Sequence, residues 1–263
     1  MNVYEVKKIE ERIAGNPYVG RGLVAGMSED GNYAVSAYFI MGRSANSRNR
    51  VFVMHGEDMY TEPFEPEKVE DPSLIIYRAL TKTGNHLIYT NGDQTDTILE
   101  GIEAGKSFSE ALKSRAFEPD GPNWTPRISV MMNFGEPAEV KAADKNGCGG
   151  KGCSGAGANN GLTYEMSILK SADPDGKACN RFTYDYEALP GIGHFLHTYI
   201  TDGNPLPTFC GEPERIVIPN DIDEFADAIW NSLDKENKIS LYVRYTALNG
   251  KCVQERLINK NQL

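Results

Sequence analysis

The sequence predicts an α+β fold in which antiparallel β-sheets are covered by helices. Strand-like segments outnumber helical ones, and several are joined by short turns typical of hairpins. About four helical segments occur, and they do not alternate regularly with the strands as a doubly wound parallel sheet requires. No internal repeat and no convincing linker is visible, so the 263 residues are predicted to form a single domain.

Composition excludes several classes of protein. Hydrophobic residues make up 40% and charged residues 24% of the chain, which is ordinary for a soluble globular protein. The net charge of −10 argues against a general nucleic-acid binder, which would present a basic face. No apolar run is long enough to span a bilayer, and the charged N-terminus lacks the apolar core of a signal peptide. We therefore expect a cytoplasmic protein without a membrane partner.

Cysteine and histidine spacing predicts no metal site. Five cysteines are an odd number, so a complete disulfide framework is not expected. Cys148 and Cys153 have four residues between them rather than the two typical of a zinc pair. His194 and His197 lie three apart on a predicted strand and so point to opposite faces. Residues 144–161 are therefore interpreted as a flexible Gly/Cys-rich loop.

The first part of the chain is predicted to contain one helix and three strands. Apolar residues at helical spacing indicate a helix over 3–14. Two strands, 18–26 and 33–41, form a hairpin, and a further strand covers 51–54. Residues 55–73 are polar and contain three prolines, which predicts a long loop.

The middle of the chain is predicted from turn and capping signals. In order, its elements are paired strands 74–80 and 86–90, a helix from the turn at Asn91 to Gly105, a helix from Ser107 to about Arg115, an irregular segment 117–126, and paired strands 127–134 and 138–143.

The last part of the chain is predicted to be mostly strands. These are 162–169, 179–186, 194–201 and 215–218, followed by a helix from Asn220 or Asp221 to about Leu233 and a hairpin of 239–247 with 252–258. Asn249-Gly250 is the strongest short hairpin signal in the chain.

The turn between residues 88 and 98 begins as a strand and ends as a helix, with Gly92 at the bend. Such a turn offers unpaired backbone N–H groups and the positive end of a helix dipole. Asp93, Thr95 and Asp96 can each act as an N-cap, which explains the turn without a ligand. More hydrogen-bonding groups are present than capping requires, so a ligand-binding turn stays open as the alternative.

Residues 42–50 concentrate hydrogen-bond donors. Three arginines, two serines and two asparagines occur in these nine residues, and all of these side chains can donate to phosphate oxygens. The alternative is a solvated loop. We favour an anion site, because no acidic residue interrupts the run.

Several of these segments together resemble the archaeal-type IMP cyclohydrolase family. In the family's order, the matching parts are 18–26, the 43–50 loop, Tyr77, the block Asn91-Gly-Asp-Gln-Thr-Asp-Thr-Ile98, Glu118 and 125–128. The Asn91 block is the most specific of them. Beyond residue 134 the resemblance thins to Thr198-Tyr199 and the strands around it. An N-terminal helix within 1–16 and the Gly/Cys loop are additions to the compact family members.

The resemblance implies a four-layered αββα sandwich similar to the N-terminal-nucleophile hydrolases, formed by one IMP cyclohydrolase-like domain over 1–263. Those hydrolases begin their mature chain with Cys, Ser or Thr. This chain begins Met1-Asn2-Val3, so we expect that nucleophile to be missing.

The activity implied is ring closure of 5-formamidoimidazole-4-carboxamide ribonucleotide to inosine monophosphate with loss of water, the last step of purine biosynthesis, without a metal or other cofactor. The carboxamide nitrogen attacks the formyl carbon of the same molecule, so positioning supplies much of the rate. The reaction also needs a base, an acid and donors to the developing oxyanion. Two alternatives are a non-catalytic purine-nucleotide-binding protein of the same fold and an amide hydrolase, which the missing nucleophile disfavours.

The resemblance also implies the site residues. Arg50 and Tyr77 would contact the oxyanion or formyl oxygen, and Glu118 would carry a proton or orient the amide. The implied substrate-binding residues are Arg21, Arg43, Ser44, Asn46, Asn91, Gly92, Thr95, Asp96 and Arg127, with Arg21, Arg43 and Arg127 available for phosphate. The implied partners are the small purine ribonucleotide and further copies of the chain in a homo-oligomer, with no nucleic acid.

These expectations combine into one spatial hypothesis. The nucleotide lies across the Gly92 bend, with its anionic end among the arginines near position 48. The hypothesis requires both regions on the same side of the molecule and a bend that is open to a ligand.

Overall fold

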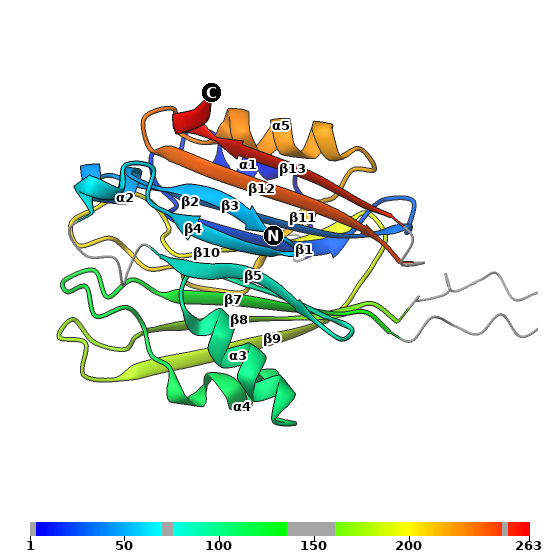
Figure 1. Cartoon of the computed structure of the whole chain (residues 1–263), viewed down its shortest axis with the longest axis horizontal. Helices are drawn as coiled ribbons and strands as arrows, with labels where there is room; N and C mark the ends of the chain where they lie inside the picture. Colours follow the sequence, from blue (N-terminus) through cyan, green and yellow to red (C-terminus); the bar gives the residue numbers. More distant parts are fainter. Residues whose placement is uncertain (1–3, 70–75, 136–160, 249–251) are drawn as a thin grey trace, which may run out of the picture.

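The α+β class is confirmed by a computed structural model, which describes residues 4–69, 76–135, 161–248 and 252–263 (Figure 1). Two antiparallel sheets and a few short helices make up this part of the chain. The predicted strand 138–143, most of the predicted 144–161 loop and the Asn249-Gly250 turn lie outside the described residues.

The first sheet has six strands in the order β11-β10-β1-β2-β12-β13. Their bounds are β1 Arg21–Met27, β2 Tyr33–Met41, β10 Ile192–His197, β11 Glu214–Val217, β12 Lys238–Ala247 and β13 Val253–Asn259. The predicted hairpins β1–β2 and β12–β13 both form. β1 is central, and its Leu23 lies opposite Tyr38 of β2 and Leu196 of β10.

The second sheet has seven strands in sequence order from β3 to β9. Their bounds are β3 Val51–His55, β4 Asp58–Glu62, β5 Tyr77–Thr83, β6 His86–Thr90, β7 Arg127–Asn133, β8 Thr163–Ser171 and β9 Cys179–Glu187. The predicted β5–β6 hairpin is confirmed, with Thr83 opposite His86. Successive strands are antiparallel neighbours throughout, even where the connection is long, as between Thr90 of β6 and Arg127 of β7.

The two sheets stack face to face over a shared apolar core. Leu23 and Tyr38 of the first sheet belong to the same cluster as Val130 and Tyr164 of the second. Tyr89 also crosses between the sheets, since its hydroxyl donates to the backbone oxygen of Val24 at 2.6 Å. Burial of these large side chains from both sheets is the main stabilising contribution to the stack.

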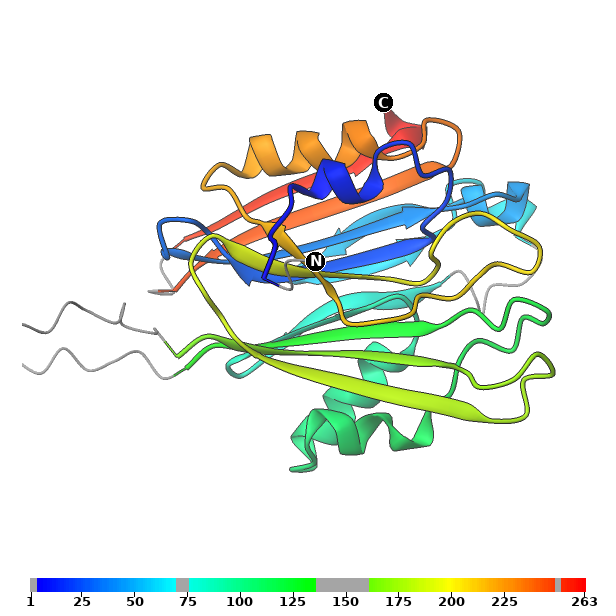
Figure 2. The ribbon, with the colours of Figure 1, turned by 180° about the vertical axis from the view of Figure 1, so that it is seen from behind.

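Helices cover both outer faces, so the layers run helices, sheet, sheet, helices (Figure 2). α1 Ile9–Ile13 and α5 Ile222–Ser232 pack on the first sheet, and α3 Gln94–Glu103 and α4 Phe108–Ala111 pack on the second. β7 lies under these helices on one side and in the core on the other, which explains why Met131 and Met132 are both buried.

The structure corrects the prediction for the N-terminus. The helix expected over 3–14 is reduced to α1, with Lys8 rather than Asn2 at the N-cap. Lys7, before it, is extended and forms a parallel bridge with Ile216 at the edge of the first sheet. Pairing with a sheet edge therefore overrides the helical pattern of the preceding residues.

The predicted loop 55–73 was also wrong. It contains β4, which pairs with β3 and β5, and a 3₁₀ helix, Pro66–Lys68. β4 buries only Met59 and Thr61, so its polar composition reflects a strand with one half-exposed face.

Other elements were predicted in the right place with shifted ends or partners. α2 Ala45–Arg48 interrupts the loop after β2, the helix expected from Ser107 is α4 followed by a 3₁₀ turn over Leu112–Ser114, and β7 pairs with β8 across the gap in the described chain.

The opposite orientation of the two histidines of β10 is confirmed. His194 lies between the sheets, 2.7 Å from the Tyr164 hydroxyl, whereas His197 stacks on Phe195 on the helix-covered face. Within the described ranges no group of three or more metal-ligating side chains comes together. Among the helices described, none is long and apolar enough to cross a bilayer.

Candidate active site

One end of the sandwich carries a cavity of about 270 Å³ where several strand ends meet. The start of β1, the end of β2, the end of β6, the start of β7 and the end of β10 converge there, as antiparallel pairing dictates. The lining residues are Tyr18, Arg21, Arg43, Ser44, Asn46, Ser47, Arg50, Asn91, Glu118, Asp120, Asn123, Thr125, Tyr199 and Leu206. The arginine-rich loop and the Asn91 turn therefore face the same space.

Two buried arginines in this cavity have unused donors. Arg50 is only 5% exposed, and its Nε and Nη1 are buried without a hydrogen-bond partner; the same holds for Nε of Arg21. Neither forms an ion pair with any acidic side chain that the structure describes. Burial and the neighbouring charge of Arg21 lower the pKa of Arg50. Unpaired buried donors are unfavourable by themselves, so this arrangement is suited to an anion or a polarised carbonyl oxygen.

Tyr77, at the start of β5, is paired with Tyr38 of β2 across the two sheets. Their hydroxyl oxygens are 2.7 Å apart and both side chains are buried. Burial and the neighbouring Tyr77 raise the pKa of Tyr38 well above its ordinary value. Both rings act electrostatically on Arg50. This tyrosine pair therefore lies beside Arg50 but does not itself line the cavity.

Glu118 lines the cavity from the irregular segment before β7, which is held by the Glu118 N–H donating to the Thr125 oxygen at 2.8 Å. Glu118 is 9% exposed, and its carboxylate accepts from Arg127, with Oε1 3.1 Å and Oε2 3.2 Å from the guanidinium. Burial raises the pKa of Glu118, outweighing the opposing effects of Arg127 and Arg21. A carboxyl group that holds its proton more tightly than usual is suited to acid–base work.

Arg127 is occupied by the protein itself. Besides Glu118, its Nη1 donates to Asp93 at 2.5 Å and to Gln94 at 2.8 Å. Its side chain lies behind Glu118, and it is not among the residues that line the cavity. The structure therefore gives Arg127 a ready role in positioning Glu118, rather than free donors for phosphate.

The bend at Gly92 is closed to a ligand. A Cβ atom at this position would lie 2.6 Å from both Arg127 Nη1 and Gln94 Oε1, and 3.0 Å from Glu118 Oε1. The glycine is needed for the close approach of these side chains to the backbone. Thus the two regions of the spatial hypothesis do lie on the same side of the molecule, but its second requirement, an open bend, is not met.

Asn91 lines the cavity but is largely engaged in holding the strands. Its Oδ1 accepts from Ile128 N at 2.8 Å and from Gln94 Nε2 at 3.1 Å, and its Nδ2 donates to Pro126 O at 2.9 Å. These bonds tie the end of β6 to the start of β7.

The structure does not bring Thr95 and Asp96 to the cavity. Thr95 is fully buried, with its hydroxyl 2.7 Å from that of Thr90. Asp96 forms an ion pair with Arg78 at 3.1 Å. Asp93 is the N-cap of α3 by position, but its carboxylate pairs with Arg127 and Arg115 instead of capping. Most polar groups of this turn are therefore satisfied within the protein.

The arginine-rich loop divides its residues between rim and interior. Arg43 lies at the rim, where Nη1 donates to Asp202 at 2.5 Å and to the Gly203 oxygen at 2.9 Å. Ser44 caps α2 by accepting from Ser47 N, and Asn46 Oδ1 is buried without a partner. Arg48 does not line the cavity; its guanidinium donates to the Gly42 oxygen and to Asn237 Oδ1 instead.

Several lining residues were not predicted. Thr125 and Tyr199 belong to segments of the family resemblance, so a signal for them existed. Tyr18 lies in another such segment, next to the first strand. Asp120, Asn123 and Leu206 come from irregular segments, and no local pattern distinguishes them.

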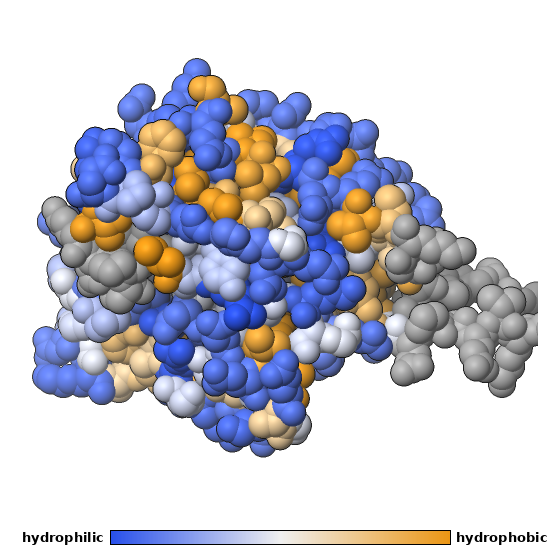
Figure 3. All heavy atoms as spheres, viewed as in Figure 1, coloured by the Kyte–Doolittle hydropathy of each residue, from blue (hydrophilic) through white to orange (hydrophobic). Residues whose placement is uncertain are grey.

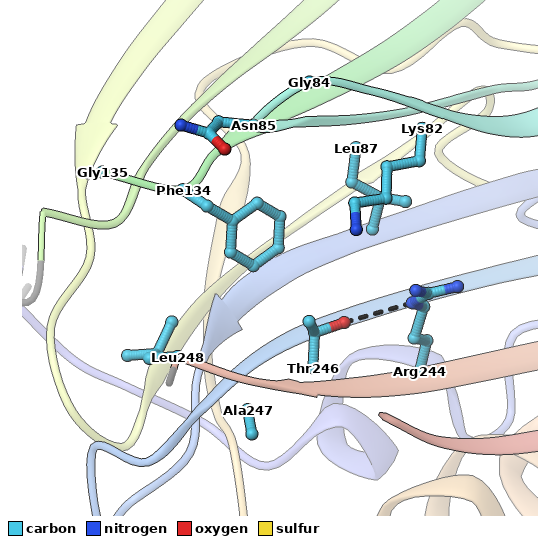
Figure 4. Close-up of a pocket in the computed structure, with 10 residues that line it drawn as sticks. All are labelled: Lys82, Gly84, Asn85, Leu87, Phe134, Gly135, Arg244, Thr246, Ala247 and Leu248. Carbon is cyan, nitrogen blue, oxygen red and sulfur yellow. Dashed lines mark hydrogen bonds between the residues drawn. The ribbon is translucent and has the colours of Figure 1, made fainter. Parts of the chain in front are cut away.

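A second cavity, of about 150 Å³, lies at the opposite end of the sandwich (Figure 4). Lys82 and Arg244 point into it beside the Phe134 ring. Arg244 is already paired, since it donates to Thr246 and lies 3.1 Å from Glu255. The cavity with unpaired arginines is therefore the better candidate for a charged substrate.

Comparison with known proteins points to one family. A family model described as IMP cyclohydrolase-like protein matches residues 18–251. The protein from Methanopyrus kandleri named IMP cyclohydrolase is 36% identical over 120 residues, covering 44% of this chain and 59% of the relative. Its namesakes from Methanococcus maripaludis (32% over 123 residues, 45% and 60%) and Methanothrix thermoacetophila (30% over 120 residues, 44% and 58%) are also similar. The aligned part thus spans less than two thirds of each relative.

Proposed function

This chain belongs to the IMP cyclohydrolase-like family, and from that premise we propose that it closes the ring of 5-formamidoimidazole-4-carboxamide ribonucleotide to give inosine monophosphate and water. One observation carries the proposal. A single cavity combines buried arginines that have unused donors with a carboxyl group of raised pKa. A nucleotide phosphate and a carbonyl oxygen are both acceptors that such arginines bind well.

The reaction is intramolecular and balances without a further reactant. The carboxamide nitrogen bonds to the formyl carbon, and the formyl oxygen leaves as water. One proton of that water comes from the carboxamide nitrogen and the other from the formamide nitrogen. Holding the two groups in contact is therefore a large part of the catalytic task.

Arg50 is proposed to stabilise the negative charge that develops on the formyl oxygen. Its free Nε–H and Nη1–H donors are buried, and Tyr38 and Tyr77 lie beside it. A donor fixed in a site that excludes water is worth about 2.7–4 kcal/mol in the transition state. Tyr77 would act together with Arg50, as expected from the resemblance.

Glu118 is proposed to give a proton to the departing oxygen. Its raised pKa keeps the protonated form available, and Arg127 holds the carboxyl in place. Arg21, Arg43, Ser44 and Asn46 remain for the phosphate, since all four line the same cavity. Thr95, Asp96 and Arg127 would then support the site from behind.

The test is direct. The purified full chain is mixed with the formamido ribonucleotide, and inosine monophosphate is followed by absorbance. We expect turnover by the wild type and its loss in Arg50→Met. Tight binding of purine ribonucleotides without turnover would favour the non-catalytic binding protein of the same fold. Failure to bind any of them would contradict both functions.

Four broader expectations accompany this proposal. The layer order supports a four-layered αββα sandwich similar to the N-terminal-nucleophile hydrolases, formed as one domain over 1–263. A cytoplasmic location remains a prediction, as does independence from any metal or cofactor.

Assembly into a homo-oligomer also remains a prediction. Most of the face drawn in Figure 3 is hydrophilic, but β13 is an edge strand with Val253 and Leu257 exposed. An exposed edge strand can pair with another copy, and analytical sedimentation would test whether copies associate.

A further inference from the structure

A chain of three side chains forms part of the cavity wall. The Thr125 hydroxyl is 2.5 Å from Asp120 Oδ2 and 2.5 Å from the Tyr199 hydroxyl. The other carboxylate oxygen of Asp120 accepts from Thr125 N at 2.7 Å. All three residues line the cavity, and Tyr199 and Thr125 are almost completely buried.

The direction of these hydrogen bonds follows from the chemistry of the groups. An ionised carboxylate only accepts, so the Thr125 hydroxyl donates its single proton to Asp120. The Thr125 oxygen must then accept from Tyr199, which uses the one proton of the phenol. Tyr199 is left with an oxygen lone pair and no proton to offer. Among the described residues no donor to this oxygen is found within hydrogen-bond distance other than Thr125 itself.

We propose that Tyr199 accepts the N–H of the substrate carboxamide and, through Thr125, passes the proton of the attacking nitrogen to Asp120. This inference rests on the proposed function and supplies the base that the ring closure requires. It makes Tyr199 a catalytic residue, and it makes Thr125 and Asp120 the groups that carry the proton away from Tyr199.

The proton transfer balances in atoms and charge. As the nitrogen–carbon bond forms, the π pair of the formyl C=O moves onto its oxygen. The nitrogen proton moves to Tyr199, the Tyr199 proton to Thr125, and the Thr125 proton to Asp120. The negative charge of the Asp120 carboxylate is thereby exchanged for one on the formyl oxygen, where Arg50 can stabilise it.

The two carboxyl groups of the cavity then have different roles in the reaction. Glu118 has a raised pKa and is suited to donating a proton to the oxygen that leaves. Asp120 accepts two hydrogen bonds from Thr125, whose hydroxyl also contacts Tyr199, so Asp120 is placed as the final proton acceptor. One acid and one base are thus available on the same irregular segment.

Asp120→Asn tests the direction of the hydrogen bonds that join Asp120, Thr125 and Tyr199 without removing any of them. The Thr125 N–H holds the amide oxygen at the Oδ1 position, so the amide NH₂ takes the Oδ2 position and donates to Thr125. Thr125 must then donate to Tyr199, and Tyr199 must donate into the cavity. All three hydrogen bonds survive, but the acceptor facing the substrate becomes a donor.

The experiment measures kcat and KM for ring closure, together with inosine monophosphate binding by calorimetry. We expect Asp120→Asn, Thr125→Val and Tyr199→Phe each to lower kcat by about 10²-fold, as for loss of a general base, with nucleotide affinity changed by less than about threefold. Thr125→Ser, which keeps the hydroxyl, should restore most of kcat. The double variant Asp120→Asn/Tyr199→Phe should be no slower than the slower single one, since both break the same path.

Asp221→Asn is the matched control, because Asp221 also accepts from backbone N–H groups but caps α5 on the far face of the first sheet. It should leave kcat unchanged. An active wild type with an equally active Asp120→Asn, or additive losses in the double variant, would overturn the relay alone. A wild type without turnover would overturn the proposed function and the relay with it.

Discussion

Replacing Arg50 by methionine is expected to make the protein more stable and less active. Arg50 is buried, its Nε and Nη1 have no partner, and it faces the charge of a second arginine, Arg21. A buried polar group left without a partner costs about 1–3 kcal/mol. Methionine retains much of the apolar stem and removes the charge, so the free energy of unfolding should rise by about 1–3 kcal/mol.

The same change should abolish most of the catalysis. Losing a donor to the developing oxyanion costs about 2.7–4 kcal/mol, which is about 10²–10³-fold in kcat. Urea unfolding at equilibrium measures the stability, and formation of inosine monophosphate measures the rate. A rise of 1 kcal/mol corresponds to about 2–4 °C in Tm for a chain of this size.

Arg48→Met provides the control within the same loop. Arg48 donates to Gly42 and Asn237, away from the cavity, so its loss should slightly lower stability and leave kcat unchanged. If Arg50→Met were destabilised like an ordinary core substitution, or kept wild-type kcat, Arg50 would not be a strained, preformed anion site.

Three further predictions concern the rest of the site and the core. Glu118→Gln should lower kcat by about 10²-fold or more while KM stays within about threefold, and equal effects on both would mean that Glu118 only binds substrate. Gly92→Ala should lower the free energy of unfolding by about 1–3 kcal/mol in urea titrations, because the added Cβ would lie 2.6 Å from Arg127; unchanged stability would show that the bend is loosely packed. Burial and the neighbouring Arg215 lower the pKa of His194 to about 4 in the folded protein. Because the unfolded chain binds this proton more readily, lowering the pH favours unfolding. Up to about 3 kcal/mol of stability should therefore be lost as pH falls from 6.5 to 4. His194→Gln should flatten urea-unfolding stability over that pH range, and an unchanged slope would exclude His194 as its source.

Local signals predicted the elements well where each segment could be interpreted alone. α5 begins where Asp221 accepts from the N–H groups of Asp223 and Glu224, and its apolar residues recur at helical spacing. The 83–85 turn produced the expected hairpin. β4 was missed because half of its residues face outward, so its strand character depends on neighbours on both sides rather than on composition.

The candidate site was predicted in part. The arginine-rich loop, Asn91 and Glu118 do come together in one cavity. Substrate binding by Thr95 and Asp96 stays a prediction, but both side chains find partners within the protein that no sequence pattern reveals. Gly92 lies at the predicted bend, and the structure shows that its backbone is closely approached by the Arg127 side chain.

The sequence by itself determined the fold class, the hairpins and the chemical types that gather in the site, because these follow from periodicity, turn residues and local composition. Only the tertiary structure decided which polar groups are satisfied by the protein and which are left for a ligand. That distinction depends on hydrogen bonds between segments far apart in the chain, such as Thr125 with Tyr199, and on the lack of such a bond at Nε and Nη1 of Arg50 among the described residues. A donor without a partner is a property of three-dimensional packing, and here it separates the candidate catalytic residues from those that hold the strands together.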